Sequence, residues 1–243
     1  MRTPHIYTQQ PLTIGSSIIL EEAPSRHISQ VMRLHPGDKL NLFNGDGQQY
    51  NACLQSCSKQ KVEAKILSAI EKDTESPINF TLALGISKGE RMDYALQKAV
   101  ELGINRFTPL FTERTVVKLK EERLERRLDH WRKVAIAACE QSGRNTIPSL
   151  EPAQQFNDWI IKSEQGTRLI LHPNATHTLD SIAAPKEFVL LLIGPEGGLS
   201  ETEITTAEAN GFMPVKLGPR VLRTETAPIA ALAAMQMLWG DFR

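Results

Sequence analysis

The chain has 243 residues, of which 41% are hydrophobic and 23% charged, and its formal net charge at pH 7 is zero. This length allows one large or two modest domains, and the composition is that of an ordinary globular protein. No apolar run approaches the roughly 20 residues of a membrane span, and the amino terminus has no stretch typical of a signal peptide, so we expect a cytoplasmic protein without membrane contact.

Alternating hydrophobic and polar residues fill most of the first 72 residues and predict short β-strands. The four expected strands read SSIILEE, DKLNLFNG, QQYNACLQ and KVEAKILSA. Turn signals separate them, in Pro36-Gly37-Asp38 and Asn44-Gly45-Asp46-Gly47. A helical insert is expected around Ser25 to Met32, and a polar linker runs from Glu71 to Pro77. We therefore predict a small β-barrel or sandwich over residues 1–72.

From residue 73 to residue 243 the pattern changes to strands alternating with helices. Near-continuous apolar strands of this kind are typical of an α/β fold with a buried, mainly parallel sheet. Ser87-x-x-Glu90 reads as a capping box that opens a helix ending at Gly103, and Ser200-x-x-Glu203 opens another helix. The expected strands are 80–87, 106–111, 168–171, 188–193 and 214–217, and further helices are expected over 120–142 and 227–239.

The chain contains three cysteines, Cys53, Cys57 and Cys139. An odd number without scaffold-like spacing argues against a disulfide framework. Cys53 and Cys57 have no second pair and no histidine cluster beside them, so we expect no metal site. Cys139 lies on the apolar helix face AIAAC, where a core residue is the favoured interpretation and a catalytic nucleophile the alternative.

Charge is distributed unevenly along the chain. Residues 1–150 carry 21 Lys and Arg against 17 Asp and Glu, whereas residues 151–211 carry 3 against 9. The basic part could meet a polyanion such as a nucleic acid. On these counts alone, scattered solvated charge is the favoured interpretation.

Three strands in the last third of the chain end in loops rich in proline and glycine, LILHPNA (169–175), LLIGPEGGLS (191–200) and KLGPRVLRTETA (216–227). A parallel sheet gathers such loops at its carboxyl edge, where ligands bind. Neither standard phosphate motif is present, and Glu196 would repel a phosphate but suit ribose hydroxyls or a cation. The loops indicate a nucleoside bearing a sulfonium and an amino acid, as in S-adenosylmethionine. Three structural turns, with Glu196 favoured by a helix dipole, are the alternative.

Long motifs run through the chain in a fixed order: HISQVMRL, SKGERMDYALQKAVELG, ERTVVKL, AIAACEQSGRNTIP, IGPEGGLS and LGPRVLRTETA. With them the sequence resembles the SPOUT methyltransferase superfamily, in its RsmE-type branch, which methylates N3 of a uridine in 16S ribosomal RNA. The resemblance covers nearly the whole chain. Two positions depart from the family pattern, because His5 stands where arginine is usual and Pro228 where a small or polar residue is usual.

The resemblance implies a PUA-like, RNA-binding β-barrel over residues 1–72 and a donor-binding α/β domain with a deep trefoil knot over residues 73–243. It further implies a homodimer without a metal. S-adenosylmethionine would be the donor, and 16S ribosomal RNA or the small ribosomal subunit the partner, methylated at position 1498 in 16S rRNA numbering. The residues implied to bind the donor are Leu171, His172, Ile193, Gly194, Pro195, Glu196, Gly197, Gly198, Leu217, Gly218, Arg220, Leu222, Arg223, Thr224 and Ala227.

Methyl transfer from a sulfonium is an in-line displacement, and uracil N3 becomes a good nucleophile only when it loses its proton. Arg223 is the catalytic candidate for stabilising the resulting anion, and a salt bridge to Glu196 or Glu225 is its alternative role. Glu196 is a weaker catalytic candidate, as a base, and shaping the donor loop is its favoured role. His172 could be a base, but a hydrogen-bonded loop residue is favoured.

The target base must be unpaired or extruded before its N3 can be reached. Basic side chains would hold the RNA through its phosphates. Arg91 is expected to be a solvated surface charge instead. The candidates for RNA binding are Arg2, Arg33, Lys88, Arg114 and Arg144.

Two other classes of function stay open from the sequence. A nucleotide-binding hydrolase or synthetase could use the same loops, although the acid among them and the lack of a phosphate motif argue against it. A non-enzymatic RNA-binding module is the other class, and the intact LGPRVLRTETA loop argues against that one.

Overall fold

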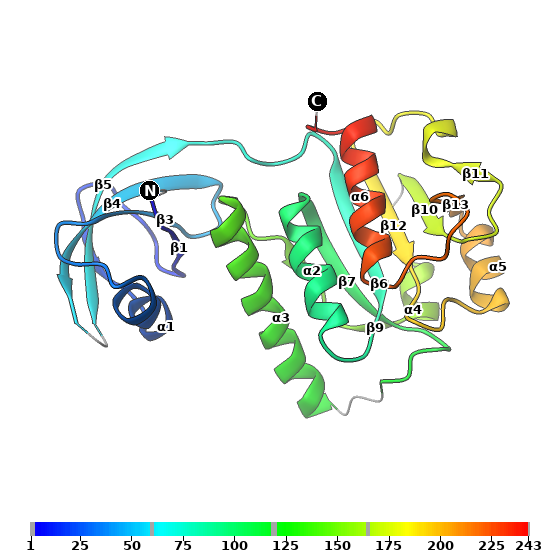
Figure 1. Ribbon diagram of the computed structural model, residues 1–243, viewed down its shortest axis with the longest axis horizontal. Coiled ribbons are helices and arrows are strands. Elements are labelled where there is room, and N and C mark those ends of the chain that lie inside the picture. The colour runs from blue at the N-terminus through cyan, green and yellow to red at the C-terminus, as the bar shows by residue number, and fades with distance from the viewer. Residues whose placement is uncertain (1–2, 59–60, 118–120, 164–165, 243) are drawn as a thin grey trace. The chain divides into compact units, whose positions relative to one another are not determined.

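The computed structural model describes residues 3–58, 61–117, 121–163 and 166–242, and Figure 1 shows the course of the chain. The chain forms two compact units. The first consists of Met1–Glu75 together with Cys139–Ile147, and the second of Ser76–Ala138 together with Pro148–Arg243. Each unit has its own sheet and its own hydrophobic core.

The first unit is built on a five-stranded sheet in the order β1-β3-β4-β5-β2. Its strands are β1 (His5–Tyr7), β2 (Ser17–Ile19), β3 (Lys39–Phe43), β4 (Gln48–Cys57) and β5 (Val62–Glu71). The pair β1–β3 is parallel and the other pairs are antiparallel. The predicted insert is the helix α1 (Glu22–Arg26), which continues as a π-helix (His27–Met32) and ends at Arg33 in a left-handed conformation. Strand alternation buries Leu40 and Leu42 completely, so the predicted β character is confirmed.

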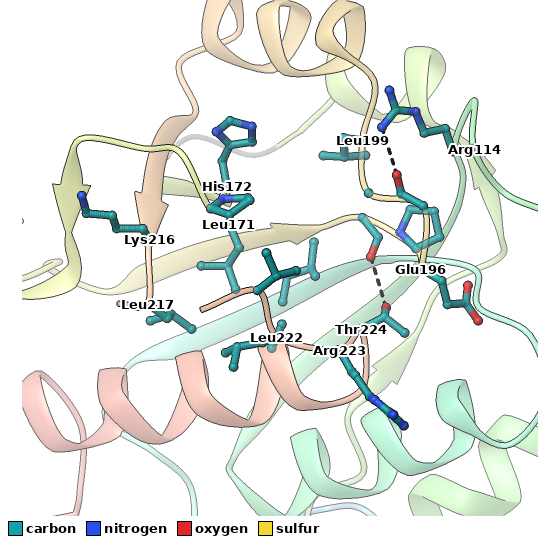
Figure 2. A pocket seen from close by; sticks show the side chains of 18 of the residues that line it. Arg114, Leu171, His172, Glu196, Leu199, Lys216, Leu217, Leu222, Arg223 and Thr224 are labelled. Carbon is teal, nitrogen blue, oxygen red and sulfur yellow. Dashed lines mark hydrogen bonds between the residues drawn. The ribbon is translucent and has the colours of Figure 1, made fainter. Parts of the chain in front are cut away.

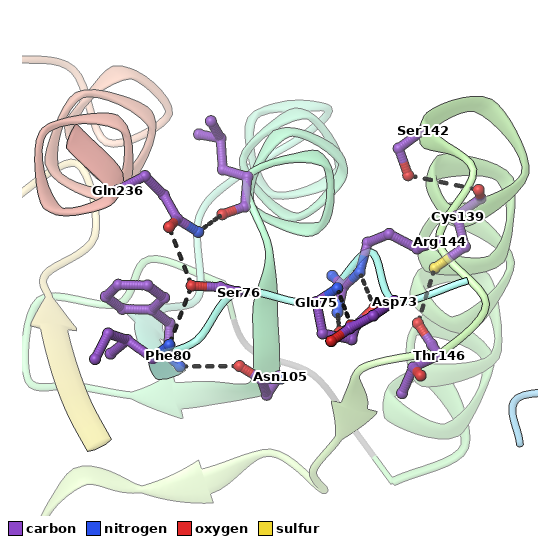
Figure 3. A network of polar contacts seen from close by, with 12 residues as sticks. Asp73, Glu75, Ser76, Phe80, Asn105, Cys139, Ser142, Arg144, Thr146 and Gln236 are labelled. Atoms are coloured by element: carbon purple, nitrogen blue, oxygen red, sulfur yellow. Dashed lines mark hydrogen bonds and ion pairs between the residues drawn. The ribbon is translucent and has the colours of Figure 1, made fainter. Parts of the chain in front are cut away.

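The segment Cys139–Ile147 belongs to the first unit, although the predicted boundary at residue 72 assigns it to the second domain. The Arg144 guanidinium forms an ion pair with Glu75, and its Nε lies 3.1 Å from Glu75 Oε1 (Figure 3). The Glu140 carboxylate accepts a hydrogen bond of 3.0 Å from the Tyr7 N–H. These partners lie far apart in the sequence. Hydrophobic periodicity therefore does not predict that Cys139–Ile147 packs within the first unit.

The second unit is built on an eight-stranded sheet whose pairs are all parallel. The order is β11-β13-β10-β12-β6-β7-β8, and β9 also pairs with β7. The central strand β12 is a fully apolar run, FVLLLI, and its neighbour β6, NFTLALG, is mostly apolar, as expected for a sheet covered on both faces. The strands are β6 (Asn79–Gly85), β7 (Ile104–Phe111), β8 (Ser149–Leu150), β9 (Gln154–Gln155), β10 (Thr167–Leu171), β11 (His177–Thr178), β12 (Phe188–Ile193) and β13 (Met213–Lys216).

Helices cover both faces of this sheet (Figure 1). α2 and α6 pack side by side on one face, and α4 and α5 pack on the other, where Trp159 and Ile204 meet Leu190 of the sheet. None of the helices in the described ranges is long and apolar enough to cross a membrane. The helices are α2 (Arg91–Glu101), α3 (Glu121–Ser142), α4 (Phe156–Ile160), a short 3-10 helix (Leu179–Ser181), α5 (Glu201–Ala209) and α6 (Thr226–Leu238).

The two predicted capping boxes have different outcomes. Ser200 and Glu203 form the predicted box at the start of α5, with bonds of 3.2 Å and 2.9 Å between side chains and backbone N–H groups. The prediction for Ser87 is wrong, because α2 begins at Arg91 without a side-chain cap. The buried Ser87 hydroxyl instead lies 3.2 Å from Thr224 Oγ1, a partner that the local pattern does not reveal.

Candidate functional site

A cavity of about 630 Å³ opens where the loops after β10, β12 and β13 meet at the carboxyl edge of the sheet. This volume lies within the usual range for small-molecule sites. All fifteen residues predicted to bind the donor line the cavity. Three further lining residues, Leu199, Val221 and Glu225, lie within the predicted donor loops. The sequence did not predict the remaining ones as donor contacts, namely Arg91, Arg114, Pro173, Glu201, Ile204, Val215 and Lys216.

Figure 2 shows how the side chains divide the cavity into two ends. Leu171, Leu217 and Leu222 lie toward one end, where His172 and Lys216 also line the cavity, whereas Glu196 and Arg223 lie toward the other. Leu171 is the last residue of β10, Leu217, Leu222 and Arg223 lie in the loop between β13 and α6, and Glu196 lies in the loop after β12. A ligand with an apolar ring system at one end and charge at the other matches this division.

Two glycines allow the close approach of the loops that form the wall. A Cβ on Gly85, at the end of β6, would lie 2.5 Å from Pro195, and a Cβ on Gly194 would lie 2.8 Å from the backbone of Leu199. Real Cβ atoms do not tolerate such contacts, so these positions require glycine. The turn in IGPEGGLS is therefore set by packing against β6.

Hydrogen bonds join the loops to one another. Thr224 Oγ1 lies 3.2 Å from the carbonyl oxygen of Gly194, which fixes the segment before α6 against the loop after β12 (Figure 2). Arg114 Nη1 donates to the Gly197 carbonyl at 3.0 Å, and the His172 N–H donates to Val215 O at 2.9 Å. The wall is thus closed by side chains and backbone groups from four separate segments.

Glu196 is held by two donors on the neighbouring segment. The Lys88 N–H lies 2.9 Å and Arg91 Nη1 lies 3.1 Å from Glu196 Oε1. Partial burial raises the pKa of Glu196, but these hydrogen bonds, its own backbone N–H and the charge of Arg91 outweigh burial, so the pKa is lowered overall. The carboxylate is therefore ionised at neutral pH and is a weak proton acceptor.

Arg91 is the residue that forms the ion pairs expected of Arg223. Its Nε lies 3.9 Å from Glu225 Oε2, in addition to its bond to Glu196. Arg91 is exposed, as expected of a surface charge, with 48% of its side chain accessible, but it also pairs with two carboxylates from segments distant in sequence. Arg223 lines the cavity, is exposed, and has no ion-pair partner among the described residues.

The two other candidates for proton transfer or nucleophilic attack are a histidine and a cysteine. His172 lines the cavity and its backbone bonds to β13, as expected for a loop residue. Cys139 belongs to the first unit, is fully buried, and lies 3.6 Å from the Thr146 carbonyl (Figure 3). Burial raises the pKa of the Cys139 thiol to about 12, so it is a core residue with little thiolate.

The residues predicted to bind RNA differ in accessibility. Arg33, Lys88 and Arg114 are exposed, whereas Arg2 lies outside the described residues. Arg144 is only 3% exposed and is paired with Glu75, so a phosphate cannot reach it. The prediction for Arg144 is therefore corrected, and its role in this structure is to anchor Cys139–Ile147 within the first unit.

The two departures from the family pattern are accommodated by packing. His5 is buried and stacks on Phe43 with ring centroids 4.3 Å apart, while its Nε2 lies 3.1 Å from the Arg144 carbonyl oxygen. Pro228 is the third residue of α6, where a backbone N–H has no intrahelical acceptor to lose. Within the described ranges, no three His, Cys, Asp or Glu side chains gather as a metal site would require.

Residues 74–236 match the family described as an RNA methyltransferase domain, and residues 20–67 match the RNA methyltransferase PUA domain. The chain is 38% identical over 241 residues to ribosomal RNA small subunit methyltransferase E of Buchnera aphidicola, with 99% of this chain and 98% of that protein covered. The protein of the same name from Bacillus subtilis is 33% identical, with 91% and 95% covered.

Solved structures resemble the fold closely. A ribosomal RNA small subunit methyltransferase E from Neisseria gonorrhoeae, bound to S-adenosylmethionine, has a TM-score of 0.94 at 42% identity over the full length of both chains. A structure from Legionella pneumophila, also in complex with S-adenosylmethionine, has a TM-score of 0.97 at 40% identity, again over both full lengths.

Proposed function

The chain belongs to the RNA methyltransferase family, and from this premise we propose that it methylates N3 of a uridine in the 16S RNA of the small ribosomal subunit, at position 1498 in 16S rRNA numbering, with S-adenosylmethionine as donor. The observation that carries the proposal is the cavity at the carboxyl edge of the sheet, which is lined by all fifteen predicted donor residues. Support comes from the relatives, since a protein 42% identical over its whole length binds this donor.

The residues of the cavity fit the proposed donor. Leu171, Leu217 and Leu222 form an apolar end suited to a purine ring. The ionised Glu196 at the other end attracts the cationic part of the donor and would repel a triphosphate. When bound, the donor supplies an activated methyl group on a sulfonium.

Arg223 is the residue that we assign to the chemistry of the acceptor. Arg223 lines the cavity, is exposed, and has no ion pair with a carboxylate among the described residues. A positive group placed there stabilises the negative charge that develops on the uracil when the N3 proton leaves. Glu196 is a poor proton acceptor because its pKa is lowered, and its role in this proposal is to bind the donor.

RNA binding falls to exposed basic residues of both units in this proposal. Arg33 lies on the first unit, which matches the RNA methyltransferase PUA domain, and Lys88 and Arg114 lie beside the cavity. These side chains would hold phosphates while the target base is extruded toward the donor. A ribosomal substrate places the reaction in the cytoplasm.

A trefoil knot and a homodimer also belong to the proposal. The bonds from Thr224 to Gly194 and Ser87 support a knot, because they seat the segment before α6 among loops formed earlier in the chain. The apolar character of α6 supports a dimer. Leu232 and Met235 are buried within the unit while Met237 is 57% exposed, and a helix apolar on all sides is normally covered on all sides.

Two measurements test the proposed function. Calorimetry should show binding of S-adenosylmethionine and of its demethylated product, and no binding of ATP; tight ATP binding without donor binding would rule the proposal out. Mass spectrometry of 16S ribosomal RNA treated with the protein and donor should then locate one methyl group on N3 of one uridine. Methylation at a carbon or a ribose oxygen would contradict the assigned chemistry.

A further inference from the structure

Arg91 connects three segments of the second unit that are far apart in the sequence. It is the first residue of α2, and its Nη1 lies 3.1 Å from Glu196 Oε1 in the loop after β12. Its Nε lies 3.9 Å from Glu225 Oε2, immediately before α6. All three residues line the cavity.

Within the part of the chain that the structure describes, Arg91 is the one cation that the two carboxylates share. Glu225 Oε2 is buried and has no hydrogen-bond donor among the described residues, so Arg91 is its nearest compensating charge. Without Arg91, Glu196 would retain the Lys88 N–H, and two carboxylates would line the cavity without the cation between them. An arginine can serve both acids because its fork presents several N–H donors in fixed directions, which a lysine cannot do.

We propose that Arg91 is a positioning residue of the donor cavity, whose guanidinium sets the places of the Glu196 and Glu225 carboxylates in two segments of its wall. This inference rests on the proposed function, because it assigns the two carboxylates to the site that binds S-adenosylmethionine. Arg91 acts through Glu196 and Glu225 and takes no part in the transfer itself.

Other charged groups around Glu196 come from every neighbouring segment of the cavity. Lys88 contributes its backbone N–H, and the side chains of Arg114, Glu201 and Arg223 line the same cavity. Arg114 is directed to the Gly197 carbonyl, so among the described residues Arg91 is the side chain that hydrogen-bonds to the Glu196 carboxylate. Removing Arg91 therefore raises the pKa of Glu196, and less of the carboxylate stays ionised as pH falls.

The first experiment compares donor affinity by calorimetry at pH 8 and at pH 4.5, the ordinary pKa of a glutamate carboxyl. We expect Arg91→Ala to weaken binding of S-adenosylmethionine about tenfold at pH 8 and further at pH 4.5, and Arg91→Lys to restore only part of the loss. The double variant Arg91→Ala with Glu196→Gln should lose the extra pH dependence. Arg132→Ala is the matched control, because it breaks an exposed ion pair of 3.0 Å with Asp129 on α3, away from the cavity.

The second experiment needs no donor and separates this inference from the proposed function. A carbon NMR titration of the Glu196 carboxyl should show a higher pKa in Arg91→Ala than in the wild type or Arg132→Ala. An unchanged pKa overturns the inference, as does a loss of affinity equal at both pH values, which a purely structural role would produce. If the pKa rises while the wild type binds no donor, the proposed function fails, and the assignment of Arg91 to a donor cavity fails with it.

Discussion

The charged side chains at one end of the cavity differ in whether another group holds them. Glu196 is held by the Lys88 N–H and by Arg91, whereas Arg223 has no ion pair among the described residues. The arrangement separates two tasks at the scale of single residues. The fixed carboxylate of Glu196 suits recognition of a cationic donor. Arg223, which has no ion pair among the described residues, is available to stabilise negative charge that develops on the second substrate.

Replacement of Arg223 by alanine should remove activity without removing the fold. The backbone carbonyl of Arg223 accepts hydrogen bonds from Thr226 and Ala227 at 2.9 Å, and these remain in Arg223→Ala. We expect methyl transfer to fall about 100-fold, as for loss of one group that stabilises developing charge, while the melting temperature changes little. Single-turnover kinetics and thermal unfolding measure the two effects, with Arg132→Ala as control; unchanged turnover would remove Arg223 from the mechanism.

Cys139 should be unreactive and dispensable for catalysis. Burial raises the pKa of its thiol to about 12, so at pH 8 almost all of it is the thiol form, which does not attack an alkylating reagent. Iodoacetamide should therefore label the half-buried Cys53 and Cys57 well before Cys139 in the native protein. Peptide mass spectrometry measures the order, and Cys139→Ala should keep methyl transfer within about twofold; early labelling with loss of activity would instead support a nucleophile.

At the scale of elements, the two predicted capping boxes show when a local sequence pattern predicts the start of a helix. The box at Ser200 forms as predicted because its two members are three residues apart and the Glu203 carboxylate has an oxygen for each partner: Oε2 accepts from the Ser200 N–H and Oε1 from the Glu113 N–H. Ser87 has the same local pattern, but its hydroxyl turns to Thr224 and to the Gly85 carbonyl. A local signal is reliable only where the fold brings no stronger partner to the same side chain.

The capping box of α5 should contribute measurably to stability. Ser200→Ala removes the acceptor of the Glu203 N–H and should lower the free energy of unfolding by about 1 kcal/mol. Thr205→Ala is the control within α5, because its exposed hydroxyl bonds only to a carbonyl of its own helix and should have a smaller effect. Chemical denaturation measures both variants, and equal losses would show that the cap is not the cause.

At the scale of the whole molecule, Arg33 and Arg144, which lie in two different family motifs, differ in how exposed they are. Arg33 is exposed, whereas Arg144 is buried against Glu75 within the first unit. We expect Arg33→Ala to weaken RNA binding and to reduce the slope of log affinity against log salt by about 1. Filter binding at several salt concentrations measures this slope, and an unchanged slope would place the RNA contact elsewhere.

Arg144→Ala should act on stability instead. It leaves the Glu75 carboxylate without its ion-pair partner, and breaking a buried pair in this way costs on the order of 3 kcal/mol. Thermal unfolding of the first unit should occur at a clearly lower temperature, while RNA affinity at low temperature keeps its salt dependence. A normal melting temperature together with a flattened salt slope would reverse the assignments of Arg33 and Arg144.

The exposed apolar surface of α6 predicts the state of assembly. If a second copy covers it, Met237→Glu places a charge in that interface and should shift the protein toward monomer. Analytical ultracentrifugation measures the change, with Met213→Glu, at an exposed methionine of β13, as control. A wild-type protein that sediments as a monomer would contradict the proposed homodimer.

The sequence by itself determined most of the longer elements, because hydrophobic periodicity and turn residues act over a few neighbours. It did not predict the short elements β1, β8, β9, β11 and α4, which offer too few residues for a periodic pattern. The family resemblance also predicted the cavity wall residue by residue. Thirteen of the fifteen implied donor residues lie in IGPEGGLS and LGPRVLRTETA, the other two are Leu171 and His172, and all fifteen line one cavity. The tertiary structure alone decided the partners of Ser87, Arg91 and Arg144. Those partners lie 137, 105 and 69 residues away, and the pairing of buried or charged groups across such separations depends on how the strands are ordered in the sheet and the segments packed around it, which no local pattern encodes.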